Sequence, residues 1–118
     1  MAILTIRTLG DPILRSKARP VSVFDDELAR FAEDMHETMN EAPGVGLAAP
    51  QVGRPIRLFV YNSGDEGERG TLVNPQVVWM SDETEEGEEG CLSIPGQYFP
   101  VVRAVRVRVE AQALDGSP

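Results

Sequence analysis

Residues 25–43, DDELARFAEDMHETMNEAP, give the strongest indication of regular structure in the chain. Four apolar side chains recur there at spacings of three, four and four residues: Leu28, Phe31, Met35 and Met39. This spacing puts them on one face of a helix. Ser22 or Asp25 can cap its N-terminus, and Pro43 is expected to end it. The pattern predicts one helix whose apolar face packs against the rest of a domain.

Strand patterns follow this helix. Residues 56–61 predict one strand, and residues 72–80 predict a bent or broken one, because Pro75 cannot donate a hydrogen bond to a neighbouring strand. In residues 105–113, valine and alanine alternate with polar residues, which predicts a strand with one apolar face. It runs into a hairpin-turn signal at residues 115–116. Without a partner strand it would leave an open apolar edge, as in a domain cut at a hairpin.

Composition narrows the class of protein. The 118 residues suit a single domain, and their formal net charge of −8 argues against nucleic acid and anionic membranes as partners. No apolar run approaches the roughly 20 residues of a membrane span, and the N-terminus lacks a signal-peptide pattern. The single cysteine, Cys91, excludes an internal disulfide and fits a reducing cytoplasm.

Residues 44–51, Gly-Val-Gly-Leu-Ala-Ala-Pro-Gln, form a segment of small and apolar residues that ends in one amide. The two glycines permit close approach of another chain, but the segment is no dinucleotide fingerprint because it follows a helix and lacks the third spaced glycine. Gln51 has two open interpretations. It is either a satisfied structural group or a donor aimed at a ligand.

Cys91 follows an acidic run, residues 82–89, with six carboxylates in eight positions. We expect most of this run to be a solvated loop. A lone cysteine is commonly a small buried hydrophobe, and that interpretation stays open. If Cys91 has a chemical role, the nearby negative charge favours a metal ligand over a free nucleophile, since a bound cation would stabilise the thiolate.

His36 begins the sequence His-Glu-Thr-Met-Asn, which matches half of a zinc-binding His-Glu-x-x-His helix. Asn40 stands where the second histidine should be, and asparagine is a poor zinc ligand. The position lies off the apolar stripe of the helix, so we expect His36 to be a surface residue.

Taken together, residues 44–51 and Glu89-Gly90-Cys91-Leu92-Ser93 resemble the first two signature motifs of the peptide deformylases. Residues 9–15, Leu-Gly-Asp-Pro-Ile-Leu-Arg, and the helix before the first motif also resemble this family, so the resemblance covers essentially residues 1–118. It implies an α+β fold in which one N-terminal helix packs with antiparallel β-sheet. It also implies a single domain whose C-terminal part, a partner strand and a metal-binding helix, is missing.

The resemblance implies a hydrolase that removes the N-formyl group from the N-terminal methionine of newly made polypeptides in the cytoplasm. N-formylmethionyl peptides or nascent chains would be its partners. Cys91 would bind one divalent metal ion, with Fe(II) as the first choice and Zn(II) or Ni(II) as alternatives.

Further roles are implied residue by residue. The Gln51 side chain and the backbone N–H of Leu92 would stabilise the oxyanion. The glycine loop would pair with the substrate backbone and wall the methionine pocket, which points to Val45 and Gly46. Two further candidates for the pocket and its entrance are Glu89 and Tyr98.

The family's third motif, a His-Glu-x-x-His helix with two metal ligands and the general base, is not among these residues. Two hypotheses follow. The chain is a deformylase without its C-terminal part, and is then expected to be inactive alone, or it is a short non-catalytic homologue that binds peptide N-termini or a protein partner. A cysteine-nucleophile hydrolase is disfavoured, because no histidine is placed to serve Cys91.

Overall fold

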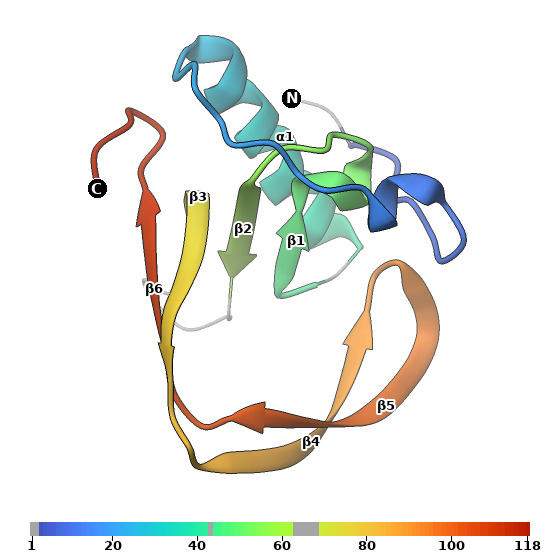
Figure 1. The fold of residues 1–118 in the computed structure, drawn as a ribbon. Coiled ribbons are helices and arrows are strands. Elements are labelled where there is room, and N and C mark those ends of the chain that lie inside the picture. Colours follow the sequence, from blue (N-terminus) through green and yellow to red (C-terminus); the bar gives the residue numbers. More distant parts are fainter. Residues whose placement is uncertain (1–2, 43, 63–68) are drawn as a thin grey trace.

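The computed structural model describes residues 3–42, 44–62 and 69–118. Its elements form two short 3-10 helices, one α-helix and six strands (Figure 1). In chain order they are η1 (Pro12–Arg15), α1 (Asp26–Glu41), β1 (Gly46–Ala48), η2 (Ala49–Val52), β2 (Leu58–Asn62), β3 (Arg69–Met80), β4 (Thr84–Cys91), β5 (Ile94–Ala104) and β6 (Val107–Gln112).

Helix α1 forms where the apolar spacing predicts it. The side chain of Asp25 accepts a hydrogen bond from the Leu28 N–H at 2.9 Å, which confirms the second of the two expected caps. The four residues of the predicted stripe are all buried. The helix ends at Glu41, and the expected stop at Pro43 lies outside the described residues.

The buried face of α1 packs against an antiparallel sheet with the strand order β1-β2-β3-β6. Five buried residues from the sheet and η2 complete the core: Leu47, Ala49, Leu58, Val60 and Val73. The partly buried Leu92 packs against this cluster. One helix against antiparallel β-structure is the α+β arrangement that the family resemblance implies.

Strands β4 and β5 form a separate two-stranded ribbon. β3 continues into β4 and β5 continues into β6 through a corner, where the Ser81 N–H donates to the Arg106 carbonyl at 2.8 Å and the Val105 N–H to the Glu83 carbonyl at 2.9 Å. In Figure 1 this ribbon curves away from α1, and its hairpin end turns back toward β1 and η2. The ribbon therefore leaves the sheet at this corner, and its hairpin end comes back to the core.

The ribbon differs from the sequence-based expectation. Residues 82–89 were expected to be mostly loop, but residues 84–89 pair with β5 as part of β4. Pairing satisfies the backbone while the ribbon leaves the carboxylates in water, so charge density does not prevent a strand here. β5 was not predicted at all, because Pro95, Gly96 and Pro100 interrupt its pattern.

β3 bends as Pro75 predicts, but it stays one strand. Its register against β6 shifts between Val73 and Gln76, and Asn74 has a left-handed φ of 52°. The Asn74 side chain accepts from the Val21 N–H at 2.7 Å and donates to the Val21 carbonyl at 2.9 Å and to the Gln112 amide oxygen at 2.7 Å. This one amide therefore joins the N-terminal segment to both strands at the bend.

The predicted strand at residues 105–113 is shorter in the structure. β6 covers residues 107–112, because residues 105 and 106 make the corner. β6 stands last in the strand order, and Val107 and Val109 are exposed on it. The predicted turn follows, where the Ala113 N–H donates to the Ser117 carbonyl at 2.7 Å.

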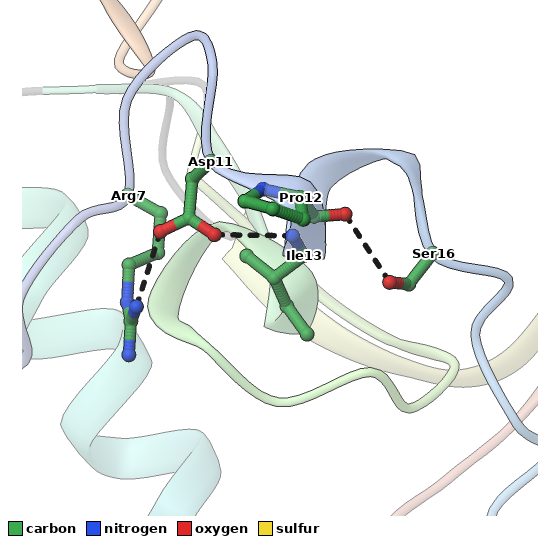
Figure 2. A network of polar contacts seen from close by, with 5 residues as sticks. All are labelled: Arg7, Asp11, Pro12, Ile13 and Ser16. Carbon is green, nitrogen blue, oxygen red and sulfur yellow. Dashed lines mark hydrogen bonds and ion pairs between the residues drawn. The ribbon is translucent and has the colours of Figure 1, made fainter.

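The N-terminal segment forms a turn that leads into η1 (Figure 2). Asp11 accepts from the Ile13 N–H at 3.1 Å and from the Arg7 guanidinium at 3.1 Å. The Ile13 N–H and then Arg7 hold the pKa of this carboxyl below its ordinary value. The Ser16 hydroxyl donates to the Pro12 carbonyl at the other end of η1.

Candidate active site

Gln51 joins the two motifs. It lies in η2, where its amide oxygen accepts from the Ala48 N–H at 3.0 Å. Its amide nitrogen donates to Cys91 Sγ at 3.6 Å and to Ser93 Oγ at 3.2 Å. The amide is therefore bonded at both ends within the protein, as the structural interpretation of Gln51 predicts, and its role as a donor to a bound ligand stays a prediction.

Cys91 ends β4, and its thiol is exposed. It pairs with Ile94 across the turn formed by Leu92 and Ser93. The interpretation of Cys91 as a buried hydrophobe is wrong, because the ribbon holds the turn at the surface of the core and not inside it. An exposed thiol beside an oriented amide is available to a ligand.

Leu92 locks the turn to the core. Its side chain packs against the hydrophobic cluster, and a Cβ added at Gly44 would come within 2.8 Å of Leu92 Cδ1. The first glycine of the segment 44–51 therefore leaves room for the leucine of the second motif. The close approach that the glycines predict takes place here between two parts of the same chain.

Val45 and Gly46 lie at the start of β1, the first strand in the sheet order. Val45 is 70% exposed, and its carbonyl accepts from the Asn62 N–H at 2.9 Å. Gly46 pairs with Tyr61, and a Cβ at this position would lie 2.8 Å from the Phe59 ring. β1 is thus bonded to β2 along one side and stands at an edge of the sheet.

Glu89 and Tyr98 lie on the ribbon. Arg103 of β5 binds the Glu89 carboxylate with N···O distances of 2.8–3.1 Å and lowers its pKa. Tyr98 stands opposite Gly90 in the register and is 68% exposed. Glu89 therefore precedes the Cys91 turn on β4, and Tyr98 follows this turn on β5.

His36 is not a surface residue, so that prediction is wrong. It is 6% exposed, and its Nε2 lies 3.0 Å from Thr71 Oγ1 of β3. Within the described part of the chain, its Nδ1 has no hydrogen-bond partner. Burial holds the pKa of His36 below its ordinary value, Arg69 lowers it further, and Glu33 acts in the opposite direction. The position of His36 next to the apolar stripe is buried in the tertiary structure, which the helix pattern alone does not show.

Comparison with known proteins identifies one family to which the chain is similar. The model of the polypeptide deformylase family matches residues 3–118. The peptide deformylase of Parafrankia sp. is 48% identical over 118 residues, which are 100% of this chain and 64% of that protein. That of Acidothermus cellulolyticus is 52% identical over 106 residues, 90% of this chain and 57% of that protein.

A solved structure shows the same fold. The crystal structure of peptide deformylase from Thermotoga maritima matches with a TM-score of 0.95 at 42% identity, over 99% of this chain and 78% of that one. The chain belongs to the peptide deformylase family. This confirms the resemblance drawn from the two motifs, and the structural match confirms the α+β arrangement.

The chain spans less than two thirds of the length of the first two relatives. No helix in the parts of the chain that the structure describes combines the length and apolar character needed to cross a membrane.

A metal ion needs more donors than this family member brings together. Residues 3–42, 44–62 and 69–118 contain no group of three His, Cys, Asp or Glu side chains placed to hold one. Cys91 offers a single sulfur, while His36 is bonded to Thr71. Because protein metal sites normally use at least three protein ligands, these residues fit one coordination position and not a complete site.

Three residues that contact the site were not singled out from the sequence. Ser93 is buried and bonds the Gln51 amide. The Arg7 N–H donates to the Gln51 carbonyl at 2.6 Å, and the Leu9 N–H donates to the Ser93 carbonyl at 2.8 Å. The backbone contacts of Arg7 and Leu9 leave no trace in side-chain patterns, so only the position of Ser93 inside the second motif could have drawn attention to it.

Proposed function

We propose that this chain is part of a metal-dependent hydrolase that removes the N-formyl group from the N-terminal methionine of newly made polypeptides. The observation that carries the proposal is the contact between the Gln51 amide nitrogen and Cys91 Sγ, at 3.6 Å. Two motifs separated by forty residues meet there, with a hydrogen-bond donor beside a potential metal ligand. Family membership of the whole segment supports the same activity.

Hydrolysis of a formamide needs a donor for the carbonyl oxygen. When water adds to the formyl carbon, this oxygen gains negative charge, and the C–N bond then breaks to give formate and the free amine. The Gln51 N–H and the Leu92 backbone N–H are the donors we assign to this oxygen. Removing one such donor typically costs about 3–4 kcal/mol of barrier, because the fixed dipole does not have to reorient.

The substrate backbone can be held at the edge of the sheet. An extended peptide adds to an exposed strand edge through main-chain hydrogen bonds. β1 stands at such an edge, and the exposed Val45 precedes it. We assign Val45 and Gly46 to the peptide backbone and the wall of the methionine pocket, and Glu89 and Tyr98 to the pocket and its entrance.

Cys91 is the metal ligand that this chain supplies. We propose Fe(II) as the native ion, with Zn(II) or Ni(II) as alternatives, since a thiolate suits all three. We propose that the other ligands and the general base are not among the described residues, where no group of three donors stands together and the histidine is bonded to Thr71. We propose the cytoplasm as the location and N-formylmethionyl peptides or nascent chains as the partners, with no direct contact to nucleic acid or membrane.

The test is a comparison of two proteins. The 118-residue chain, purified alone, should keep no stoichiometric iron, zinc or nickel in elemental analysis and release no formate from formyl-methionyl peptides. The polypeptide encoded by the complete reading frame should retain a stoichiometric metal ion and release formate from these peptides. In that polypeptide, Cys91→Ser should abolish metal retention, and Gln51→Ala should lower kcat about 10²- to 10³-fold.

Full activity of the Cys91→Ser polypeptide would remove Cys91 as a ligand and overturn the proposal. A reading frame that stops at codon 118, together with formyl-peptide binding and no turnover, would favour the second function, a non-catalytic homologue that binds peptide N-termini. The free edge of β1 is the observation that allows this second function.

A further inference from the structure

Ser93 is a buried polar residue of the second motif that contacts the first motif. It is 4% exposed, and its hydroxyl oxygen accepts a hydrogen bond from the Gln51 amide nitrogen at 3.2 Å. A buried hydroxyl without a partner costs free energy, so this contact is favourable for Ser93 itself. The same contact restrains Gln51, the residue that faces Cys91.

The amide of Gln51 has one oxygen and two N–H groups. The Ala48 N–H binds the oxygen at 3.0 Å, so the nitrogen end must face the β4–β5 turn. Two acceptors meet that end, Ser93 Oγ at 3.2 Å and Cys91 Sγ at 3.6 Å. Because a thiol sulfur is a weaker acceptor than a hydroxyl oxygen, the hydroxyl is the stronger restraint on the terminal torsion, which is intrinsically broad in glutamine.

The two residues are also fixed to one another through the backbone. The Arg7 N–H donates to the Gln51 carbonyl at 2.6 Å, and two residues later the Leu9 N–H donates to the Ser93 carbonyl at 2.8 Å. Residues 7–9 therefore hold η2 and the turn after β4 in fixed relative positions. These backbone contacts position Ser93 relative to Gln51.

We propose that Ser93 is a positioning residue, whose hydroxyl fixes the Gln51 side-chain amide so that an N–H group stays beside Cys91. Its catalytic consequence rests on the proposed function, because a donor held in place stabilises developing charge better than one that must reorient. Ser93 acts through Gln51 and has no contact with the reacting atoms in this scheme.

The direct test is solvent exchange of the Gln51 side-chain N–H groups, measured by NMR on the ¹⁵N-labelled 118-residue chain. In Ser93→Ala, the protected N–H should exchange roughly 2- to 10-fold faster, the range set by the net strength of one hydrogen bond. In Ser93→Cys, which offers a weak sulfur acceptor, the Gln51 exchange rate should lie between those of the unsubstituted chain and Ser93→Ala.

The matched control is Ser81→Ala. The hydroxyl of Ser81 is likewise hydrogen-bonded, donating to the Glu83 carbonyl and accepting from the Arg106 N–H, but it lies at the ribbon corner. Its loss should leave Gln51 exchange unchanged. If Ser93→Ala does not fold, the Ser93→Cys chain decides alone, and the same Gln51 exchange rate in that chain and the unsubstituted chain overturns the positioning role.

Kinetics of the polypeptide from the complete reading frame separate the two proposals. There, Ser93→Ala should lower kcat roughly 2- to 10-fold and leave KM unchanged, because the lost restraint matters where charge develops. If Ser93→Ala speeds Gln51 exchange but the unsubstituted polypeptide from the complete reading frame has no deformylase activity, the positioning role is supported and only the proposed function is overturned. Unchanged exchange in folded Ser93→Ala overturns the positioning role, whatever the activity.

Discussion

The helix-packed core and the β4–β5 ribbon are stabilised in different ways. In the core, α1 covers β1 and β2, and residues such as Met35, Val60 and Val73 have no exposed surface. In the ribbon, all residues of β4 but one are exposed, and that one is partly buried. The ribbon therefore depends on strand pairing and on its attachment at the corner and the Cys91 turn (Figure 1).

This difference matters because the candidate site lies at the boundary. Gln51 belongs to the core side, and Cys91 belongs to the tip of the ribbon. Leu92 and Ser93 are the points where the tip is buried against the core. Because the ribbon is exposed, we expect it to open locally without loss of the core, and such opening would separate Cys91, the proposed metal ligand, from Gln51, the proposed oxyanion donor.

The largest effect should follow from a cavity in the core. Met35→Ala removes a fully buried side chain and should lower the free energy of unfolding by about 2–5 kcal/mol. The matched ribbon variant is Val102→Ala, which truncates an exposed side chain and should change it by less than about 0.5 kcal/mol. Urea denaturation of both variants checks this, and equal losses would break the distinction between core and ribbon.

A smaller effect in the core should depend on pH. Because burial lowers the pKa of folded His36, the unfolded chain binds the proton first as the pH falls. The stabilising contribution is therefore complete above the unfolded pKa of about 6.5 and declines between that pH and the lower folded pKa. The thermal midpoint of the chain should fall as the pH is lowered through this window.

The control for this pH effect is His36→Gln. Since His36 is the only histidine, this variant should lose the decline with pH around 6.5, although it is less stable throughout. A decline of the same size in both proteins would show that His36 does not titrate from a buried state.

The smallest effect should come from the ribbon's ion pair. Glu89→Gln weakens the exposed pair with Arg103 and should leave the thermal midpoint of the whole domain unchanged within error. Backbone hydrogen exchange in β4 and β5 should become faster, and added salt should reduce the difference.

Glu88→Gln alters the net charge equally on the same strand and serves as the control. The comparison of ribbon and core would be wrong if Glu89→Gln lowered the midpoint of the whole domain as Met35→Ala does.

Much of the fold was predictable because it is local. The spacing of the apolar residues in α1, the Asp25 cap and the bend at Pro75 are all expressed within a few residues. β4 and β5 were not, because neither strand has an alternating apolar face. Strand pairing, which satisfies both backbones, decides them. His36 was misjudged for a related reason, since its burial and its bond to Thr71, 35 residues away in the chain, arise only in the folded structure.

The identity of the site residues was also available from the sequence, since the two motifs and their separation indicate the family by themselves. Their roles as ligand, donors and pocket remain predictions. The meeting of Gln51 with Cys91, and the part of Ser93 in it, required the corner that folds the ribbon back onto the core.

The order of residues alone determined the helix and the family and narrowed its cap to Ser22 or Asp25, because these depend on side chains close together in the chain. Tertiary structure decided the environment of each group: the buried imidazole of His36, the exposed thiol of Cys91, and the Gln51 amide held between the Ala48 N–H and the side chains of Ser93 and Cys91. Hydrogen bonds and burial depend on distance in space, and contacts across forty residues exist only after the chain has folded.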